Sequence, residues 1–139
     1  MNFYLHGLNG RVISNNALTD DALSLKPADL ILANPPFGSM GGDARARRED
    51  LAITTSNKQL LFLQHIYRSL KPGGRVAVVV PDNFLFETDA GRRVRQELFE
   101  TCDVHTILRL PVGIFYATGV SNVVLMFTRR APTDQPAED

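Results

Sequence analysis

Two runs of consecutive apolar residues stand out along the chain and predict strands. Residues 75–80 read RVAVVV, with KPGG before them and PDN after them. A continuous β-branched run bounded by turn residues is typical of a strand that is covered on both faces in a parallel sheet. Residues 30–33 form a shorter run, LILA, which ends at Asn34 and two prolines. We therefore expect two buried, parallel strands.

The segment between these runs has the spacing of an amphipathic helix. Ser56 is followed three positions later by Gln59, which is a capping-box pattern, and Pro72 and Gly73 provide a stop signal. A strand, a helix and a second strand in this order imply a right-handed crossover between parallel neighbours. The apolar residues at helical intervals are Leu60, Leu63, Tyr67 and Leu70.

The C-terminal half predicts a second helix and a hairpin. In the segment ETDAGRRVRQELFETC, residues 87–102, an apolar stripe runs through Ala90, Val94 and Leu98. Residues 104–111 and 122–129 have the composition of strands. The connection between them is too short for a crossover helix, so these two strands should pair antiparallel at the end of the sheet.

The N-terminal part predicts less regular structure, namely a short helix and a weak strand near residues 11–14. Together the elements predict an α/β fold, with a mostly parallel sheet and a C-terminal antiparallel hairpin. We expect one domain over residues 1–130. Residues 131–139 read as a disordered tail.

Composition narrows the class of protein. The chain has 139 residues, 44% of them hydrophobic, which suffices for one core. Fifteen basic residues balance fifteen acidic ones, so no overall positive field attracts nucleic acid, although RARRED and GRRVRQE are locally basic. One cysteine and no long apolar segment indicate a soluble, cytoplasmic protein that does not enter a membrane. Three scattered histidines give no metal-ligand spacing, so we expect no metal site.

The turn NPPF, Asn34 to Phe37, carries the strongest chemical signal. It follows the carboxyl end of a predicted parallel strand, where ligands gather in open α/β sheets. Because Pro35 and Pro36 stiffen the turn, the Asn34 side-chain oxygen and the Pro35 carbonyl oxygen are two free acceptors beside the Phe37 ring. They match a planar group with an exocyclic NH₂, stacked on that ring. A tight turn with Phe37 in the core is the simpler interpretation of these residue types.

NPPF resembles the [D/N/S]-P-P-[Y/F/W] motif of amino-group methyltransferases that use S-adenosylmethionine. More of the chain resembles one branch of that superfamily, the modification (M) subunits of type I restriction-modification systems, which belong to the N6-adenine DNA methylases. The resemblance runs from residue 2 to about residue 127. The segments that carry it are MNFYLHGL, DLILANPPFG, LLFLQHIYRSLKPGGRVAVVVPDNFLF and LPVGIFYATGVSNVVLMF.

The resemblance implies a Rossmann-like methyltransferase fold and a role for each residue of the turn. Asn34 and Pro35 would accept hydrogen bonds from the N6 amino group of an adenine flipped out of duplex DNA, with Pro36 stiffening the turn. Phe37 would stack on the base, and the methyl group would pass directly from S-adenosylmethionine. Phe115 or Tyr116 would form another wall of the pocket, a core role being the alternative for each.

The resemblance also implies what this chain lacks. The family's glycine-rich cofactor turn precedes the matched segment, and neither HGLNG nor GSMGG has the strand-turn-helix context of such a turn. Asn16 stands where the family commonly has an acidic contact to the cofactor's adenine, so it is the cofactor-binding candidate. We therefore interpret the chain as an incomplete Rossmann-like domain, a cloned piece or a truncated gene, that is inactive alone.

The family's strand order, 3-2-1-4-5-7-6, gives this chain strands 3, 4, 5, 6 and 7. The strand that ends at Asn34 would lose its usual neighbour, and its free edge invites a homodimer. DNA and the specificity and restriction subunits are the partners that the resemblance implies. Arg45, Arg47 and Arg48 follow the turn and would contact DNA phosphates, disorder of their segment being the alternative.

Three functions stay open from the sequence. The first is the core of an N6-adenine DNA methylase, and the second is a methyltransferase that acts on RNA bases or on a protein glutamine. The third is a catalytically silent structural or interaction fragment. The helix and hairpin typical of type I subunits favour DNA, whereas the missing glycine turn supports the silent fragment.

Overall fold

The computed structural model describes residues 1–40, 48–115 and 119–132. The helices and strands in these ranges are α1 (Asn2–Leu5), the 3-10 helix η1 (Asp20–Ser24), β1 (Ala28–Ala33), α2 (Lys58–Arg68), β2 (Leu70–Pro81), the 3-10 helix η2 (Asp82–Leu85), α3 (Ala90–Thr101), β3 (Cys102–Arg109) and β4 (Asn122–Arg129). None of these helices is long and apolar enough to cross a membrane. Most of the predicted tail, residues 133–139, lies outside the described residues.

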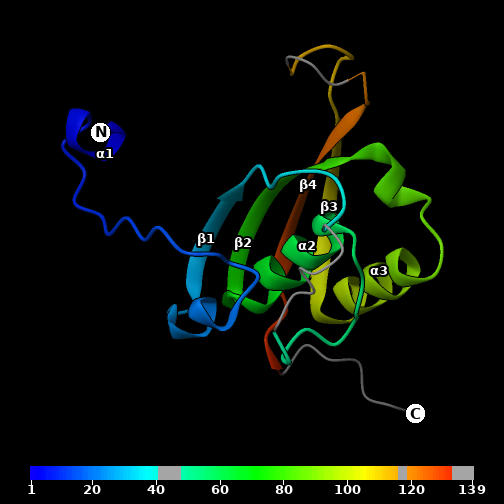
Figure 1. Ribbon diagram of the computed structural model, residues 1–139, viewed down its shortest axis with the longest axis horizontal. Helices are drawn as coiled ribbons and strands as arrows, with labels where there is room; N and C mark the ends of the chain where they lie inside the picture. The colour runs from blue at the N-terminus through cyan, green and yellow to red at the C-terminus, as the bar shows by residue number, and fades with distance from the viewer. Residues whose placement is uncertain (41–47, 116–118, 133–139) are drawn as a thin grey trace.

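The strands form a mixed sheet in the order β1-β2-β4-β3 (Figure 1). β1 and β2 are parallel, whereas β4 pairs antiparallel with both β2 and β3. The α/β class, the parallel crossover and the antiparallel hairpin are therefore confirmed. The sheet is not mostly parallel, because β4 runs against both of its neighbours. The observed order matches strands 4-5-7-6 of the order that the resemblance implied.

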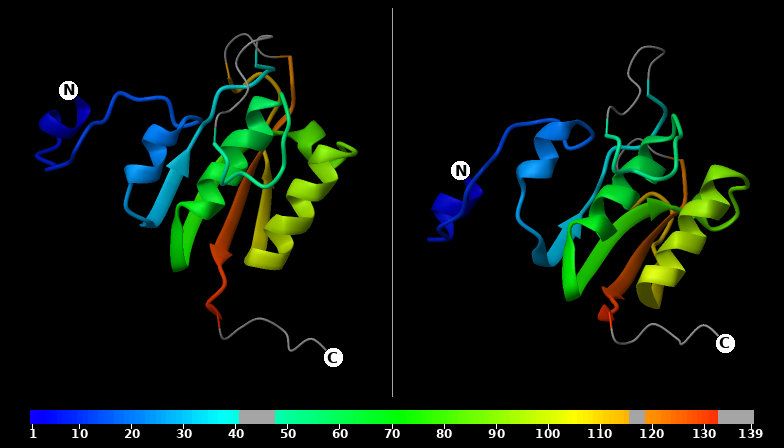
Figure 2. Two further views of the ribbon diagram at one scale, coloured as in Figure 1. Left: turned by 60° about the horizontal axis from the view of Figure 1, so that its bottom comes forward. Right: turned by 90° about the horizontal axis from the view of Figure 1, so that it is seen from below.

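Helices α2 and α3 cover one face of this sheet (Figures 1 and 2). The core between helices and sheet includes Leu60 and Leu63 of α2 and Val94 and Leu98 of α3, all at most 1% exposed. The predicted stripes are thus confirmed for both helices except at Leu70, which begins β2 because α2 ends at Arg68. Burial of each such side chain contributes about 1.5–3 kcal/mol. The sheet supplies alternate side chains, among them Val76, Val78, Val80, Val123, Leu125 and Phe127.

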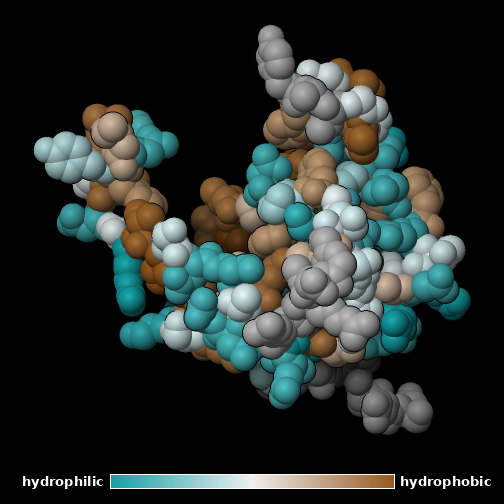
Figure 3. All heavy atoms as spheres, in the orientation of Figure 1, coloured by the Kyte–Doolittle hydropathy of each residue, from teal (hydrophilic) through white to brown (hydrophobic). Residues whose placement is uncertain are grey.

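The opposite face of the sheet is open at β1. Ile31 and Ala33 pack toward the core, but Leu30 and Leu32 point to the other side and are 53% and 73% exposed. Figure 3 shows hydrophobic atoms here, in the recess between the body and the N-terminal segment. The prediction that this strand is buried on both faces is wrong, because it lies at the sheet edge and the described residues place no helix over its second face.

Two further local predictions are wrong. Residues 11–14 form no strand, since the family order places strand 3 beside strand 2 and the chain supplies no such partner. Helix α2 is capped by Asn57, not by Ser56: the Asn57 side-chain oxygen accepts hydrogen bonds from the amides of Gln59 and Leu60. Asparagine caps as well as serine does, so the sequence alone left two adjacent choices.

Candidate functional site

The NPPF turn begins where the β1 ladder ends. Ala33 is the last residue of β1 and pairs with Val78 of β2. The next residue, Asn34, is exposed, Pro35 is buried and Phe37 is half-buried. The burial of Pro35 fixes the turn against the body of the protein, while the Asn34 amide faces solvent. The turn therefore presents a polar group at the carboxyl end of a parallel strand, as the sequence predicted.

The loops after β2 and β3 leave the sheet at the same end as this turn, because the carboxyl ends of β1, β2 and β3 all point that way. The Asp82 amide donates to the Ser121 carbonyl oxygen (2.9 Å), which joins the end of β2 to the β3–β4 connection. The Arg109 guanidinium lies 3.6 Å from an Asp82 carboxylate oxygen. Figure 1 shows these connections above the same ends of the strands. Among the described residues, these connections therefore lie at the same end of the sheet as the turn.

The predicted pocket wall falls in the β3–β4 connection. Phe115 is half-buried there, and Tyr116 lies outside the described residues. Because β1 and β3 form opposite edges of the sheet, about three strand spacings, or roughly 14 Å, separate the starts of these loops. The structure thus brings Phe115 to the same end of the strands as the turn, on the connection that follows the opposite edge strand.

The residues after the turn form two backbone hydrogen bonds with the start of α2 and the residues just before it. Gly38 has φ +109°, which favours glycine, and its carbonyl oxygen accepts a hydrogen bond from the Lys58 amide (2.9 Å). Two residues later the Met40 amide donates to the Ser56 carbonyl oxygen (2.8 Å). Asn57, between these two contacts, was missed by the sequence analysis. Its signal was its place one residue before a helix.

Asn16 does not have the surroundings of a cofactor ligand. It is exposed, and its side-chain oxygen accepts a hydrogen bond from the Leu18 amide (3.0 Å) in a local turn. That oxygen already accepts one local hydrogen bond, and the described residues contain no glycine-rich strand turn, so they do not make a complete site for S-adenosylmethionine. Nor do the described ranges contain a group of three His, Cys, Asp or Glu side chains arranged to hold a metal ion.

Arg48 is part of a buried polar cluster. It is only 7% exposed, and its guanidinium donates to Asp50 and to the Ala17 carbonyl oxygen (3.1 Å). It also donates to Nδ1 of His65 (2.6 Å), so that nitrogen carries no proton. The prediction that Arg48 contacts DNA is therefore wrong for this conformation, because the cluster consumes its donors. Arg45 and Arg47 lie outside the described residues.

The cluster shifts the pKa of both of its titratable groups. Burial, followed by the nearby Arg48 charge, lowers the pKa of His65 below its usual value. The hydrogen bond from Arg48 lowers the pKa of Asp50. Both shifts keep the charge pattern that the cluster needs, with a neutral imidazole, a carboxylate and a guanidinium.

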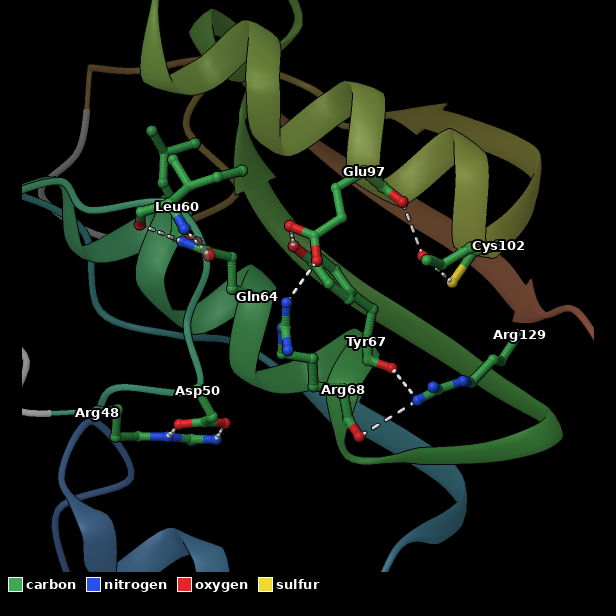
Figure 4. Close-up of polar contacts among 11 residues, drawn as sticks. Arg48, Asp50, Leu60, Gln64, Tyr67, Arg68, Glu97, Cys102 and Arg129 are labelled. Carbon is green, nitrogen blue, oxygen red and sulfur yellow. Dashed lines mark hydrogen bonds and ion pairs between the residues drawn. The ribbon is translucent and has the colours of Figure 1, made fainter.

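A second polar group joins the two helices. Figure 4 shows Tyr67 and Arg68 of α2 converging on Glu97 of α3, with distances of 2.8 and 2.6 Å to its carboxylate oxygens. Burial and this carboxylate raise the pKa of Tyr67, so the phenol stays protonated and donates. Burial also raises the pKa of the Cys102 thiol, which lies in the core. These groups hold the helices together, away from the turn.

Comparison with known proteins identifies the family. The family model described as N-6 DNA Methylase matches residues 1–137. The chain belongs to this family. This N-6 DNA methylase chain is 48% identical over 135 residues to the type I restriction enzyme StySPI methylase subunit of Salmonella potsdam. The EcoKI methylase subunit of Escherichia coli K12 is equally similar. In each case the match covers 93% of this chain and 25% of the relative.

Solved structures of such subunits share the fold of this N-6 DNA methylase chain. The crystal structure of the EcoKI M protein matches with a TM-score of 0.85 and 46% identity, over 95% of this chain and 28% of that chain. A modification subunit of a putative type I restriction enzyme from Vibrio vulnificus matches with a TM-score of 0.80 and 36% identity, over 94% and 30%. The resemblance inferred from the sequence is thus confirmed. The chain spans about a quarter of the length of these relatives.

Proposed function

We propose that this chain carries the acceptor half of a type I DNA adenine N6-methyltransferase. The observation that supports this most is the exposed Asn34 amide at the carboxyl end of β1, with buried Pro35 and half-buried Phe37 behind it, in a chain of this family. The matching curated relatives are named methylase subunits of type I restriction enzymes. The methyl donor in this family is S-adenosylmethionine, for which the described residues do not form a site.

The turn has the groups needed to hold an adenine amino group. The Asn34 side-chain oxygen and the Pro35 carbonyl oxygen would each accept one N6 hydrogen, which directs the nitrogen lone pair away from the turn. Pro36 limits the freedom of the turn, and the Phe37 ring would stack on the flipped base, worth about 1–3 kcal/mol. Phe115, and Tyr116 on the same connection, would close the pocket from the β3 side.

DNA is the proposed acceptor, and the proposed partners are the specificity and restriction subunits of a type I complex. The pocket accepts a base outside the helix, so a subunit that reads the sequence in the duplex must deliver it. Nothing in the turn itself distinguishes one adenine from another. Sequence choice therefore belongs to the partner, and the RNA and glutamine acceptors become controls in the assay.

The test replaces the matching segment of the EcoKI methylase subunit with residues 1–139 of this chain. The exchanged subunit, assembled with its specificity subunit, is assayed for methyl transfer to unmethylated DNA. Asn34→Ala should lower kcat about 10²–10³-fold, because one positioned hydrogen-bond acceptor is lost. Asn16→Ala is the matched control and should retain the parent rate. Equal rates for Asn34→Ala and the parent would contradict the proposal.

A binding measurement on the 139-residue chain tests whether its donor site is incomplete. Titration of the chain with S-adenosylmethionine in a calorimeter should give no saturable heat up to millimolar ligand. This corresponds to a binding free energy weaker than about −4 kcal/mol. Micromolar affinity would show that the chain forms a cofactor site by itself. A chain that binds neither cofactor nor DNA and does not support activity after exchange would be the silent fragment.

We also propose that the free edge of β1 pairs with a second copy of the chain. β1 lies at the edge of the sheet, and its side chains Leu30 and Leu32 are exposed. An edge strand offers unpaired backbone donors and acceptors to another strand. Pairing of two such edges around a twofold axis would satisfy both strands at once.

A further inference from the structure

Asn57 lies between the turn and the connection that follows β2. Its side-chain oxygen accepts hydrogen bonds from the amides of Gln59 (3.0 Å) and Leu60 (3.4 Å) at the start of α2. Its side-chain nitrogen donates to Oε1 of Glu87 (2.9 Å), in the segment between η2 and α3. One half-buried amide therefore uses its oxygen for the helix and its nitrogen for a different connection.

The backbone around Asn57 holds the end of the NPPF turn. The Lys58 amide donates to Gly38, the Met40 amide donates to Ser56, and a β-bridge joins Ser39 to Asn57 itself. Gly38 directly follows Phe37, so these backbone contacts begin one residue from the stacking ring. They join the end of the turn to the start of α2.

Hydrogen bonds to η2 and α3 hold Glu87, the partner of Asn57, in place. Its amide donates to the Asn83 carbonyl oxygen (2.9 Å), and its own carbonyl oxygen accepts from the Arg95 guanidinium (2.7 Å). Arg95 also donates to the Phe84 carbonyl oxygen (2.6 Å). A Cβ at Gly91 would lie 2.7 Å from the Glu87 Cβ, so the Glu87 side chain packs directly on α3 where only glycine leaves room.

These contacts join two loops that leave neighbouring strands. One loop follows β1 and carries Asn34 and Phe37, and the other follows β2 and contains η2. We propose that the hydrogen bond from Asn57 to Glu87 is a positioning contact that fixes the NPPF turn relative to the η2 connection. The inference that this contact serves catalysis rests on the proposed function. Asn57 and Glu87 are positioning residues and do not touch the base.

The chain allows the donor and acceptor to be exchanged. Asn57→Asp keeps an oxygen for the helix cap, because aspartate caps as well as asparagine, but it turns a carboxylate toward Glu87. Adding Glu87→Gln restores one hydrogen bond with reversed direction, from the Gln amide to the Asp carboxylate. Gln96→Glu is the matched control, since Gln96 donates to Glu100 (2.9 Å) on exposed α3 and the substitution makes the same change away from the turn.

The first measurement uses the 139-residue chain and needs no activity. With 4-fluorophenylalanine at position 37, the ¹⁹F signal reports the surroundings of the ring. We expect Asn57→Asp to shift and broaden this signal, the double variant to return it to the parent position, and Gln96→Glu to leave it unchanged. An unchanged signal in Asn57→Asp, or no recovery in the double variant, would overturn the positioning contact.

The second measurement uses the EcoKI subunit with the exchanged segment. Asn57→Asp should lower kcat about tenfold, since small displacements of a reacting group are costly, with KM for DNA and the melting temperature nearly unchanged. The double variant should recover kcat, whereas an equal loss in both would overturn the role in catalysis. If the ¹⁹F result holds and even the parent segment gives no methyl transfer, the proposed function fails while the positioning contact stands.

Discussion

His65 shows how one residue makes the stability of this chain depend on pH. Its Nδ1 accepts a hydrogen bond from Arg48, and burial together with the Arg48 charge lowers its pKa from 6.5. Asp50, also bonded to Arg48, acts in the opposite direction on His65 but more weakly. The folded protein therefore binds the His65 proton less readily than the unfolded chain does.

The sign of the effect follows from this difference. Well above pH 6.5 the imidazole is neutral in both states, and the contact contributes its full stability. As the pH falls below that value, the unfolded chain takes up a proton that the folded protein resists, so the free energy of unfolding decreases. Urea unfolding at pH 7 and pH 5 should show this decrease, and His65→Gln should reduce it. The same decrease in His65→Gln would assign it to other groups.

Gln64 makes a side-chain contact in the buried core. It is 0% exposed, and its amide group pairs with both backbone groups of Ile53, at 3.0 and 2.9 Å. It thereby supplies the hydrogen bonds that a neighbouring strand would otherwise give. This pairing holds the segment after the NPPF loop against α2.

Replacement of Gln64 by leucine should be strongly destabilising. Gln64→Leu keeps the volume but leaves the buried amide and carbonyl of Ile53 without partners, at about 1–3 kcal/mol for each group. Chemical denaturation should therefore show a loss of about 2–6 kcal/mol in the free energy of unfolding. Gln96→Leu, on an exposed face of α3, should change the stability by less than about 0.5 kcal/mol. A similar small loss for Gln64→Leu would refute the pairing.

At the scale of helices and strands, periodic patterns of apolar residues predicted the elements that bury a regular set of side chains in the core. The stripe Ala90, Val94 and Leu98 and the range 122–129 are confirmed, because each buries a regular set of apolar side chains. β2 begins at Leu70 rather than residue 75, since the segment KPGG continues along the ladder through a bulge opposite Ala28 and Leu30. Proline and glycine read as a stop to the helix and gave no sign of this bulge.

The candidate site was predictable only where a local motif carries it. Asn34 and its neighbours are consecutive, so a single turn delivers them together. Asn57 and Glu87 are 30 positions apart, and their contact depends on how α2 and α3 pack. The burial of Arg48 likewise depends on Ala17 and His65, which no sequence pattern relates to it. Contacts of this kind appear only when the tertiary structure is known.

For the whole molecule, the open edge and face at β1 predict self-association. Leu32, 73% exposed at this edge, would be covered by a second copy. Leu32→Lys should remove the association, because a charge at an edge strand opposes pairing, and should leave the melting temperature nearly unchanged. Sedimentation velocity over a range of concentrations measures this. Phe99→Lys is the control, since Phe99 is 53% exposed on α3. A monomer before any substitution would refute the homodimer.

The place of β4 between β2 and β3 determines the order in which the fold can form during synthesis. β2 and β3 are both synthesised before β4, yet β3 cannot join the sheet until β4 pairs with β2. Arg129, its last residue, donates to the carbonyl oxygens of Tyr67 (3.0 Å) and Arg68 (3.3 Å), as Figure 4 shows, and also to that of Leu70 (3.0 Å). The C-terminal end of α2 therefore gains these hydrogen bonds only when β4 is in place. The core therefore cannot close until the chain as far as residue 129 has emerged from the ribosome.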